Sequence, residues 1–142
     1  MLTVGGATVS WSAPDERVLV IDDQSYVRGT MVIALAANGF EAVTAESGPA
    51  GLAALDGSKF DLAIIDVYMP GMDGIQVIKE VRARVGNLPI IAMSGVQLGV
   101  SEHTALDHLP KLASMAAVVC LRKPFRPHEL LDAVHSALRV TA

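Results

Sequence analysis

Short apolar runs alternate along the chain with longer segments in which apolar residues recur at helical spacing. A continuous apolar run of a few residues, bounded by turn or polar residues, is typical of a buried strand. The sequence predicts such strands over residues 17–21, 41–45, 61–66, 89–93 and 117–121. The best defined of these runs leads directly into Asp66 and then into a loop with one proline and two glycines.

The segments between these strands carry apolar residues about four positions apart, which is the spacing of one helical face. They predict helices over residues 26–38, 47–55 and 75–85, and a last helix that begins at Pro127. Gly39 closes the first helix, because glycine is favoured just past a helix end. Residues 96–116 are less regular, since Gly99 and Pro110 interrupt the pattern. That segment is predicted as two short helical pieces or as a loop and a helix.

Alternation of strands and helices predicts an α/β domain. Five βα units imply a doubly wound, five-stranded parallel sheet with helices on both faces. Residues 1–14 are rich in Gly, Ser and Thr and have no clear period, so they predict a flexible amino-terminal arm. Residues 15–142 then form a single domain.

The composition excludes several classes of protein. The 142 residues are 51% hydrophobic, which excludes a disordered chain, and the net charge is −4 with no basic block. No apolar run approaches the roughly 20 residues of a membrane helix. Cys120 is the only cysteine, so no internal disulfide forms. We therefore expect a cytoplasmic domain with no direct nucleic-acid contact and no membrane insertion.

Polar residues follow four of the five predicted strands. They are Asp22 and Asp23 after the first, Asp66 after the third, Ser94 after the fourth and Lys123 after the last. Each has a plain structural explanation when taken alone. Asp22, Asp23 or Ser94 could cap a helix, Asp66 could be a turn residue, and Lys123 could be a solvated loop lysine. The carboxyl ends of parallel strands share one edge of a sheet, however, so the five side chains are predicted to converge.

Clustered carboxylates repel one another and require a cation or a bound proton. Carboxylate, carbonyl and water oxygens suit Mg2+. A metal ion beside an ammonium and a hydroxyl is an arrangement that binds a phosphoryl group. An aspartate can itself be the nucleophile and form an acyl phosphate. Asp66 is the best placed for that role, because Asp22 and Asp23 can hold the metal.

These motifs together resemble the receiver domain of two-component response regulators. The resemblance covers about residues 17–138 and rests on Asp22-Asp23, on Asp66 with the loop at residues 69–74, on Ser94-Gly95 and on residues 123–125. It implies the flavodoxin-like strand order 2-1-3-4-5, with the site at the switch point of the sheet. It also implies a cis peptide bond between Lys123 and Pro124.

The resemblance assigns a role to each site residue. Asp66 is the phosphoacceptor. Asp23 and Asp66 ligate Mg2+ directly together with the backbone carbonyl of Tyr68, and Asp22 acts on the metal through a water. Ser94 and Lys123 bind the phosphoryl oxygens. The donor is a histidine kinase or a histidine phosphotransfer protein. The output is a change in protein contacts at the fourth helix, the last strand and the last helix, and a homodimer is compatible with it.

Three positions depart from the family pattern. Cys120 stands where the family carries the Phe or Tyr that rotates on activation, so we expect a different readout; the thiol itself is interpreted as a small buried hydrophobe. Tyr68 and Val96 occupy positions that modulate hydrolysis of the acyl phosphate, and we predict that they shield Asp66 from water. The stretch from Ser94 to Lys123 is longer than usual by roughly two helical turns.

The sequence therefore predicts a phosphorylated signalling switch, not an enzyme that acts on other substrates. The chain ends soon after the last helix, which fits a stand-alone regulator or the receiver fragment of a longer regulator with an output domain. A phosphatase with an aspartyl-phosphate intermediate is the alternative enzyme, but it needs Asp-x-Asp where this chain has Asp22-Asp23. A nucleotide- or flavin-binding module is a weaker alternative, because no Gly-rich turn follows the first strand.

Overall fold

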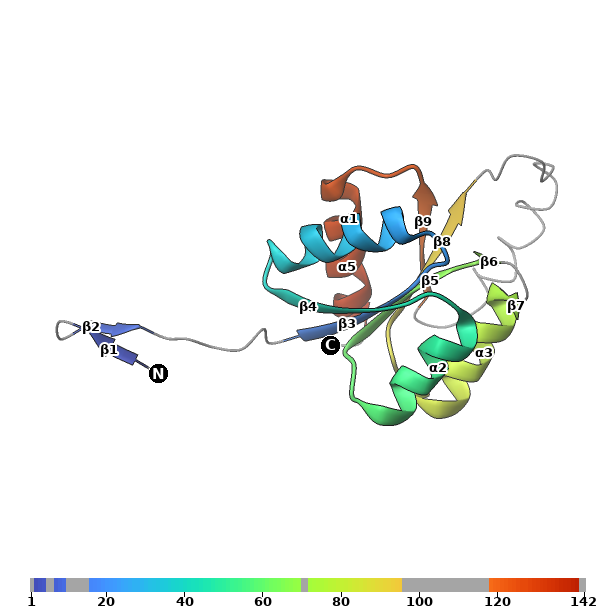
Figure 1. Cartoon of the computed structure of the whole chain (residues 1–142), viewed down its shortest axis with the longest axis horizontal. Coiled ribbons are helices and arrows are strands. Elements are labelled where there is room, and N and C mark those ends of the chain that lie inside the picture. The colour runs from blue at the N-terminus through green and yellow to red at the C-terminus, as the bar shows by residue number, and fades with distance from the viewer. Residues whose placement is uncertain (1, 5–6, 10–15, 70–71, 96–117, 141–142) are drawn as a thin grey trace.

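A five-stranded parallel sheet forms the centre of the molecule. The computed structural model describes residues 2–4, 7–9, 16–69, 72–95 and 118–140. The strands of the sheet are β3 (Glu16–Ile21), β4 (Phe40–Ala45), β5 (Leu62–Asp66), β8 (Ile90–Gly95) and β9 (Val118–Lys123). They lie in the order β4-β3-β5-β8-β9 (Figure 1). Counted along the chain this is 2-1-3-4-5, so the predicted fold is confirmed.

Helices cover both faces of the sheet. In Figure 1, α1 (Ser25–Ala36) and α5 (Pro127–Val140) lie on one side, and α2 (Gly48–Gly57) and α3 (Gly74–Arg84) lie on the other. Successive strand residues point to opposite faces. Val18 and Val20 accordingly pack with α1 and α5, whereas Leu19 and Ile21 pack with α2 and α3. This division explains why the strands read as continuous apolar runs in the sequence.

The predicted helices are present, with ends that differ by a few residues. The first helix ends at Ala36, and Gly39 follows with φ +86°, a conformation that favours glycine. The second begins after Ser47, whose hydroxyl accepts a hydrogen bond from the N–H of Ala50 at 3.2 Å. The predicted cis bond between Lys123 and Pro124 is also present.

Two pairs of short strands were not predicted. Strands β1 (Leu2–Val4) and β2 (Ala7–Val9) pair antiparallel within the segment expected to lack regular structure. Strands β6 (Tyr68–Met69) and β7 (Met72–Asp73) form a second small ribbon directly after Asp66. Flexibility of the arm and its boundary with the domain stay predictions. The irregular segment predicted over residues 96–116 lies outside the described residues.

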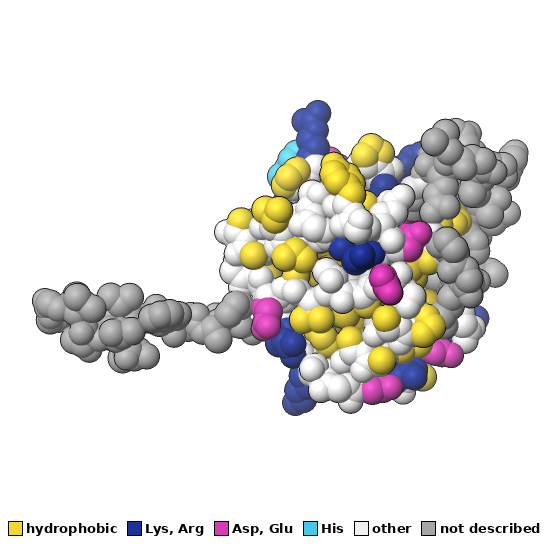
Figure 2. All heavy atoms as spheres, viewed as in Figure 1, with side chains coloured by type: hydrophobic (Ala, Val, Ile, Leu, Met, Phe, Trp, Pro, Cys, Tyr) yellow, Lys and Arg dark blue, Asp and Glu magenta, His cyan; other side chains and the backbone are white. Residues whose placement is uncertain are grey.

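Charged side chains are dispersed over the face of the domain drawn in Figure 2, where Lys and Arg alternate with Asp and Glu. Hydrophobic side chains reach the surface along α1 in the same view. Within the described ranges, no helix is long and apolar enough to cross a membrane.

Gly74 allows the loop after Asp66 to fold back on the strand. Its N–H donates to the carbonyl of Val67 at 3.2 Å, and an added Cβ would lie 2.3 Å from the Cα of Val67. We predict that Gly74→Ala lowers the free energy of unfolding by about 2 kcal/mol, because backbone atoms cannot yield as a side chain can. Urea denaturation of both chains measures the difference.

Gly29 provides the matched control, since it lies within α1 and nothing stands within 4 Å of an added Cβ. Gly29→Ala should raise the free energy of unfolding by about 0.5 kcal/mol, because alanine loses less backbone entropy in a helix. Equal effects of the two substitutions would contradict the close approach at Gly74.

Candidate functional site

Two buried acids occupy the carboxyl edge of the sheet. Asp66 is the last residue of β5, and Asp22 follows β3 directly. Their exposed fractions are 2% and 0%, and they are the buried charged residues of the described part of the chain. Parallel register explains their proximity, because Ile21 pairs with Ile65 one position before each acid. Leaving water is costly for a carboxylate unless the protein supplies partners.

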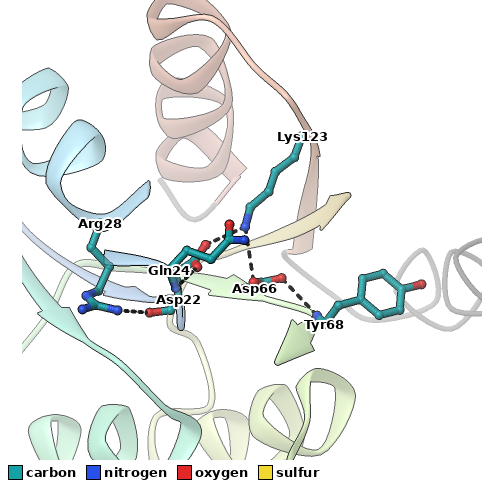
Figure 3. Close-up of polar contacts among 6 residues, drawn as sticks. All are labelled: Asp22, Gln24, Arg28, Asp66, Tyr68 and Lys123. Carbon is teal, nitrogen blue, oxygen red and sulfur yellow. Dashed lines mark hydrogen bonds and ion pairs between the residues drawn. The ribbon is translucent and has the colours of Figure 1, made fainter. Parts of the chain in front are cut away.

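Lys123 supplies the opposite charge. Its Nζ lies 2.6 Å from Oδ2 of Asp22 and 3.2 Å from Oδ2 of Asp66 (Figure 3). It stands at the end of the edge strand β9, and β8 separates that strand from β5. The side chain therefore has to extend past the end of β8 to reach both acids.

Gly95 makes this path possible. It pairs with Lys123 in the sheet register, and a Cβ added to it would lie 3.1 Å from the Cβ of Lys123 and 3.5 Å from its Cδ. A side chain at position 95 would crowd the lysine stem. In the sequence this glycine appears only as part of the Ser94-Gly95 motif, because its spatial role depends on the pairing of β8 with β9.

Backbone amides hold the other carboxylate oxygens. Oδ1 of Asp22 accepts from the N–H of Gln24 at 2.9 Å, and Oδ1 of Asp66 accepts from the N–H of Tyr68 at 3.0 Å. Both bonds span two residues, which is the Asx-turn pattern. The N-cap residue of α1 is Gln24, so neither Asp22 nor Asp23 caps that helix. The turn role considered for Asp66 is real and coexists with its contact to Lys123.

The third acid faces solvent. Asp23 is exposed, yet carboxylate oxygens of Asp22, Asp23 and Asp66 all lie within 4.8 Å of one another. Three hard oxygen donors, one open to water, fit a cation such as Mg2+, which keeps several of its waters. The predicted convergence of these acids is therefore present in the structure.

Burial dominates the electrostatics at Asp66. It raises the pKa of this carboxyl above its ordinary value; the Lys123 ammonium and the Tyr68 amide lower the pKa, and the charge of Asp22 raises it further. Two buried carboxylates share one ammonium, so the pair carries an excess of negative charge that a bound cation would offset.

Ser94 lies at the same edge but is not joined to the acids. It is half-buried in β8, one position beyond Met93, which pairs with Asp66. Among the described residues, no hydrogen bond links its hydroxyl to either buried carboxylate. Its predicted role toward phosphoryl oxygens stays a prediction.

The structure corrects the interpretation of Cys120, which was expected to be a small buried hydrophobe. Cys120 is exposed. It lies on the edge strand β9 and points to the opposite face from Leu121, which is buried against α1 and α5. Partial burial nevertheless raises the pKa of the thiol. Its effect on the readout stays a prediction.

The ring of Tyr68 does not cover Asp66 in this structure (Figure 3). Figure 3 shows the Tyr68 ring extended away from the carboxylates, while its backbone N–H holds Asp66. The half-buried ring packs against the apolar cluster on the side of α2 and α3. Val96 lies outside the described residues, so the pairing of these two side chains stays a prediction.

Comparison with known proteins places this chain in a family. The family model described as "Response regulator receiver domain" matches residues 18–135. The transcriptional regulatory protein FixJ of Bradyrhizobium diazoefficiens is 32% identical over 86% of this chain and 56% of its own length. The DNA-binding transcriptional regulator NtrC of Salmonella typhimurium is 35% identical over 85% of this chain and 24% of its own. The chain thus spans about half or less of these relatives.

Solved structures agree with the fold. The chemotaxis protein CheY4 of Vibrio cholerae superposes with a TM-score of 0.72 at 30% identity, covering 87% of this chain and 98% of that one. A response regulator receiver domain protein from Clostridium thermocellum gives a TM-score of 0.77 at 27% identity, with 87% and 94% covered.

Burial of the Asp66 charge predicts an unusual stability effect. In metal-free buffer at pH 7, Asp66→Asn should raise the free energy of unfolding by about 1 kcal/mol, because it removes the cost of burying an ionised carboxylate, which outweighs the attraction of Lys123, and retains a similar shape. The raised pKa means that ionised Asp66 opposes folding, so the gain should shrink as pH falls through the folded-state pKa and Asp66 takes up a proton. Chemical denaturation between pH 4 and pH 8 measures this dependence.

Asp56→Asn is the matched control, since Asp56 forms an exposed ion pair with Arg84 at 3.0 Å. Its effect should stay small at every pH. A loss of stability in Asp66→Asn at pH 7 would show that the partners of the Asp66 carboxylate outweigh the cost of its burial and would contradict the prediction.

Cys120 should be accessible but slow to react. A raised pKa leaves little thiolate at pH 8, and the thiolate is the nucleophile. We predict that an aromatic disulfide reagent modifies the folded chain more slowly than it modifies a free small thiol, and that denaturant removes the difference. Modification of the folded chain at or above the rate of the free thiol would exclude this.

Proposed function

Because the chain belongs to the receiver domain family of two-component response regulators, we propose that Asp66 accepts a phosphoryl group and that this domain passes the change on as altered protein contacts. One observation carries the proposal. A carboxylate that is 2% exposed ends the central strand, within 3.2 Å of an ammonium and close to two further acids. Such a carboxylate is oriented before any donor arrives, which is a recurrent device for lowering a barrier.

Phosphoryl transfer forms one bond and breaks one. An oxygen of Asp66 attacks phosphorus, and the phosphorus–nitrogen bond of a phosphohistidine donor breaks, so that the imidazole leaves with the electron pair. The product is an acyl phosphate on Asp66. Lys123 is already in place to neutralise a phosphoryl oxygen, because its Nζ bridges the two buried acids. We assign Ser94 the role of a hydroxyl donor to a second oxygen.

The donor set fits a magnesium ion. Asp23 and Asp66 would hold it directly with the backbone carbonyl of Tyr68, and Asp22 would act through a water. When bound, Mg2+ supplies positive charge that offsets both the clustered acids and the phosphoryl oxygens. The exposure of Asp23 supports its direct role, whereas the buried carboxylates of Asp22 and Asp66 each already have a protein partner on both oxygens.

Protein partners complete the proposal. A histidine kinase or a histidine phosphotransfer protein would be the donor, and α1 offers contact area beside the site, because Tyr26 and Ile33 are 81% and 73% exposed on one face of that helix. The readout would involve β9, α5 and the segment before β9, with a homodimer as one form. The cytoplasm is the expected location. The relatives' greater length supports the receiver fragment of a longer regulator.

A small-molecule phosphodonor tests the chemistry without a kinase. We predict that acetyl phosphate with Mg2+ adds the mass of one phosphoryl group to the chain, as measured by intact mass spectrometry. A chelator should abolish the adduct, and hydroxylamine should release it, as expected of an acyl phosphate.

Asp66→Asn should gain no mass, whereas Asp56→Asn should behave as the unmodified sequence does, because Asp56 is exposed and pairs with Arg84 instead of Lys123. An adduct that persists in Asp66→Asn, or that forms equally well with a chelator present, would overturn the assignment of Asp66.

A further inference from the structure

Arg28 reaches back from α1 to the strand end that carries the first two acids. Its Nη1 donates to the backbone carbonyl of Asp22 at 2.8 Å (Figure 3). The side chain is half-buried, and it lies six residues beyond the carbonyl that it binds. Nothing in the spacing of the strand-end residues along the sequence points to this helix residue.

With this bond, every polar group of Asp22 has a protein partner. The Asp22 N–H donates to the carbonyl of Ala45 at 3.1 Å. Its Oδ1 accepts from the N–H of Gln24, and its Oδ2 binds Lys123. Arg28 holds the remaining group, the carbonyl, which belongs to the peptide bond that leads into Asp23.

We propose that Arg28 is a positioning residue that orients Asp23 toward the cation by fixing the Asp22–Asp23 peptide. Asp23 is exposed, so little packing restrains its side chain, and its direction depends on the backbone from which it starts. A hydrogen bond from a charged donor fixes a carbonyl more firmly than water does. This inference rests on the magnesium site of the proposed function.

Orientation and charge predict opposite effects of removing Arg28. Loss of a nearby positive charge would by itself strengthen cation binding. Loss of a group that orients a metal ligand weakens binding, typically by 10–100-fold. The direction of the change therefore separates the two roles, and a role confined to stability predicts no change in affinity at all.

The test is a titration of the full chain with Mg2+. Binding is measured by calorimetry and, separately, by the shift in melting temperature. We predict that Arg28→Met lowers Mg2+ affinity about 10-fold. Arg28→Lys, which keeps a charged donor on a long stem, should recover most of the loss. In acetyl phosphate reactions, Arg28→Met should raise the Mg2+ concentration needed for half the maximal rate and should leave the rate at saturating Mg2+ largely unchanged.

Arg84→Met is the matched control, because Arg84 pairs with Asp56 and Glu80 on the exposed side of α3. It should leave Mg2+ affinity unchanged. If Arg28→Met does not fold, Arg28→Gln provides the same comparison, because its shorter side chain ends at the position of Nε and lacks both the charge and the Nη1 donor that binds the Asp22 carbonyl.

The outcomes distinguish this inference from the proposed function. Unchanged or tighter Mg2+ binding by Arg28→Met, with normal binding by the unsubstituted chain, would overturn the role of Arg28 and leave the phosphoacceptor assignment standing. An unsubstituted chain that binds no Mg2+ would overturn the metal site and this inference with it.

Discussion

The site depends on two buried carboxylates that share one ammonium. Asp22 and Asp66 come from neighbouring strands, and Lys123 reaches them from the edge strand, past Gly95. Without the lysine, two anions would stand out of water beside each other, which no fold tolerates at neutral pH without proton uptake. The ammonium balances one of the two negative charges and connects the edge of the sheet to its centre.

The two buried carboxylates carry more negative charge than the single Lys123 ammonium balances, and this excess favours the binding of a cation. The pKa of Asp66 is raised chiefly by burial, which the attraction of Lys123 does not fully offset, and the charge of Asp22 adds to the rise. A cation at the exposed side, where Asp23 faces water, would balance the excess negative charge. A phosphoryl group on Asp66 would change the distribution of that charge, because phosphate oxygens are further acceptors for Lys123. The proposed ligands, a cation and a phosphoryl group, would therefore both act on the charge balance of these acids.

Backbone groups contribute as much to the site as side chains do. Amides at positions 24 and 68 hold one oxygen of each buried acid, and Arg28 holds the carbonyl between the first two acids. Gly74 permits the loop after Asp66 to return against Val67. These contacts fix the geometry of the carboxylates before any ligand binds, which is the general requirement for a precise phosphoryl site.

The sequence by itself determined the fold, the strand order through its family resemblance, and the residues that meet at the carboxyl edge. It could do so because parallel strands bring their ends together whatever the details of packing. Only the tertiary structure decided that Asp22 is buried while its neighbour Asp23 is exposed, that Cys120 is exposed, and that Lys123 passes over Gly95. It also brought Arg28 onto the Asp22 carbonyl. Each of these depends on which strand or helix lies alongside, a relation between distant segments that local patterns do not contain.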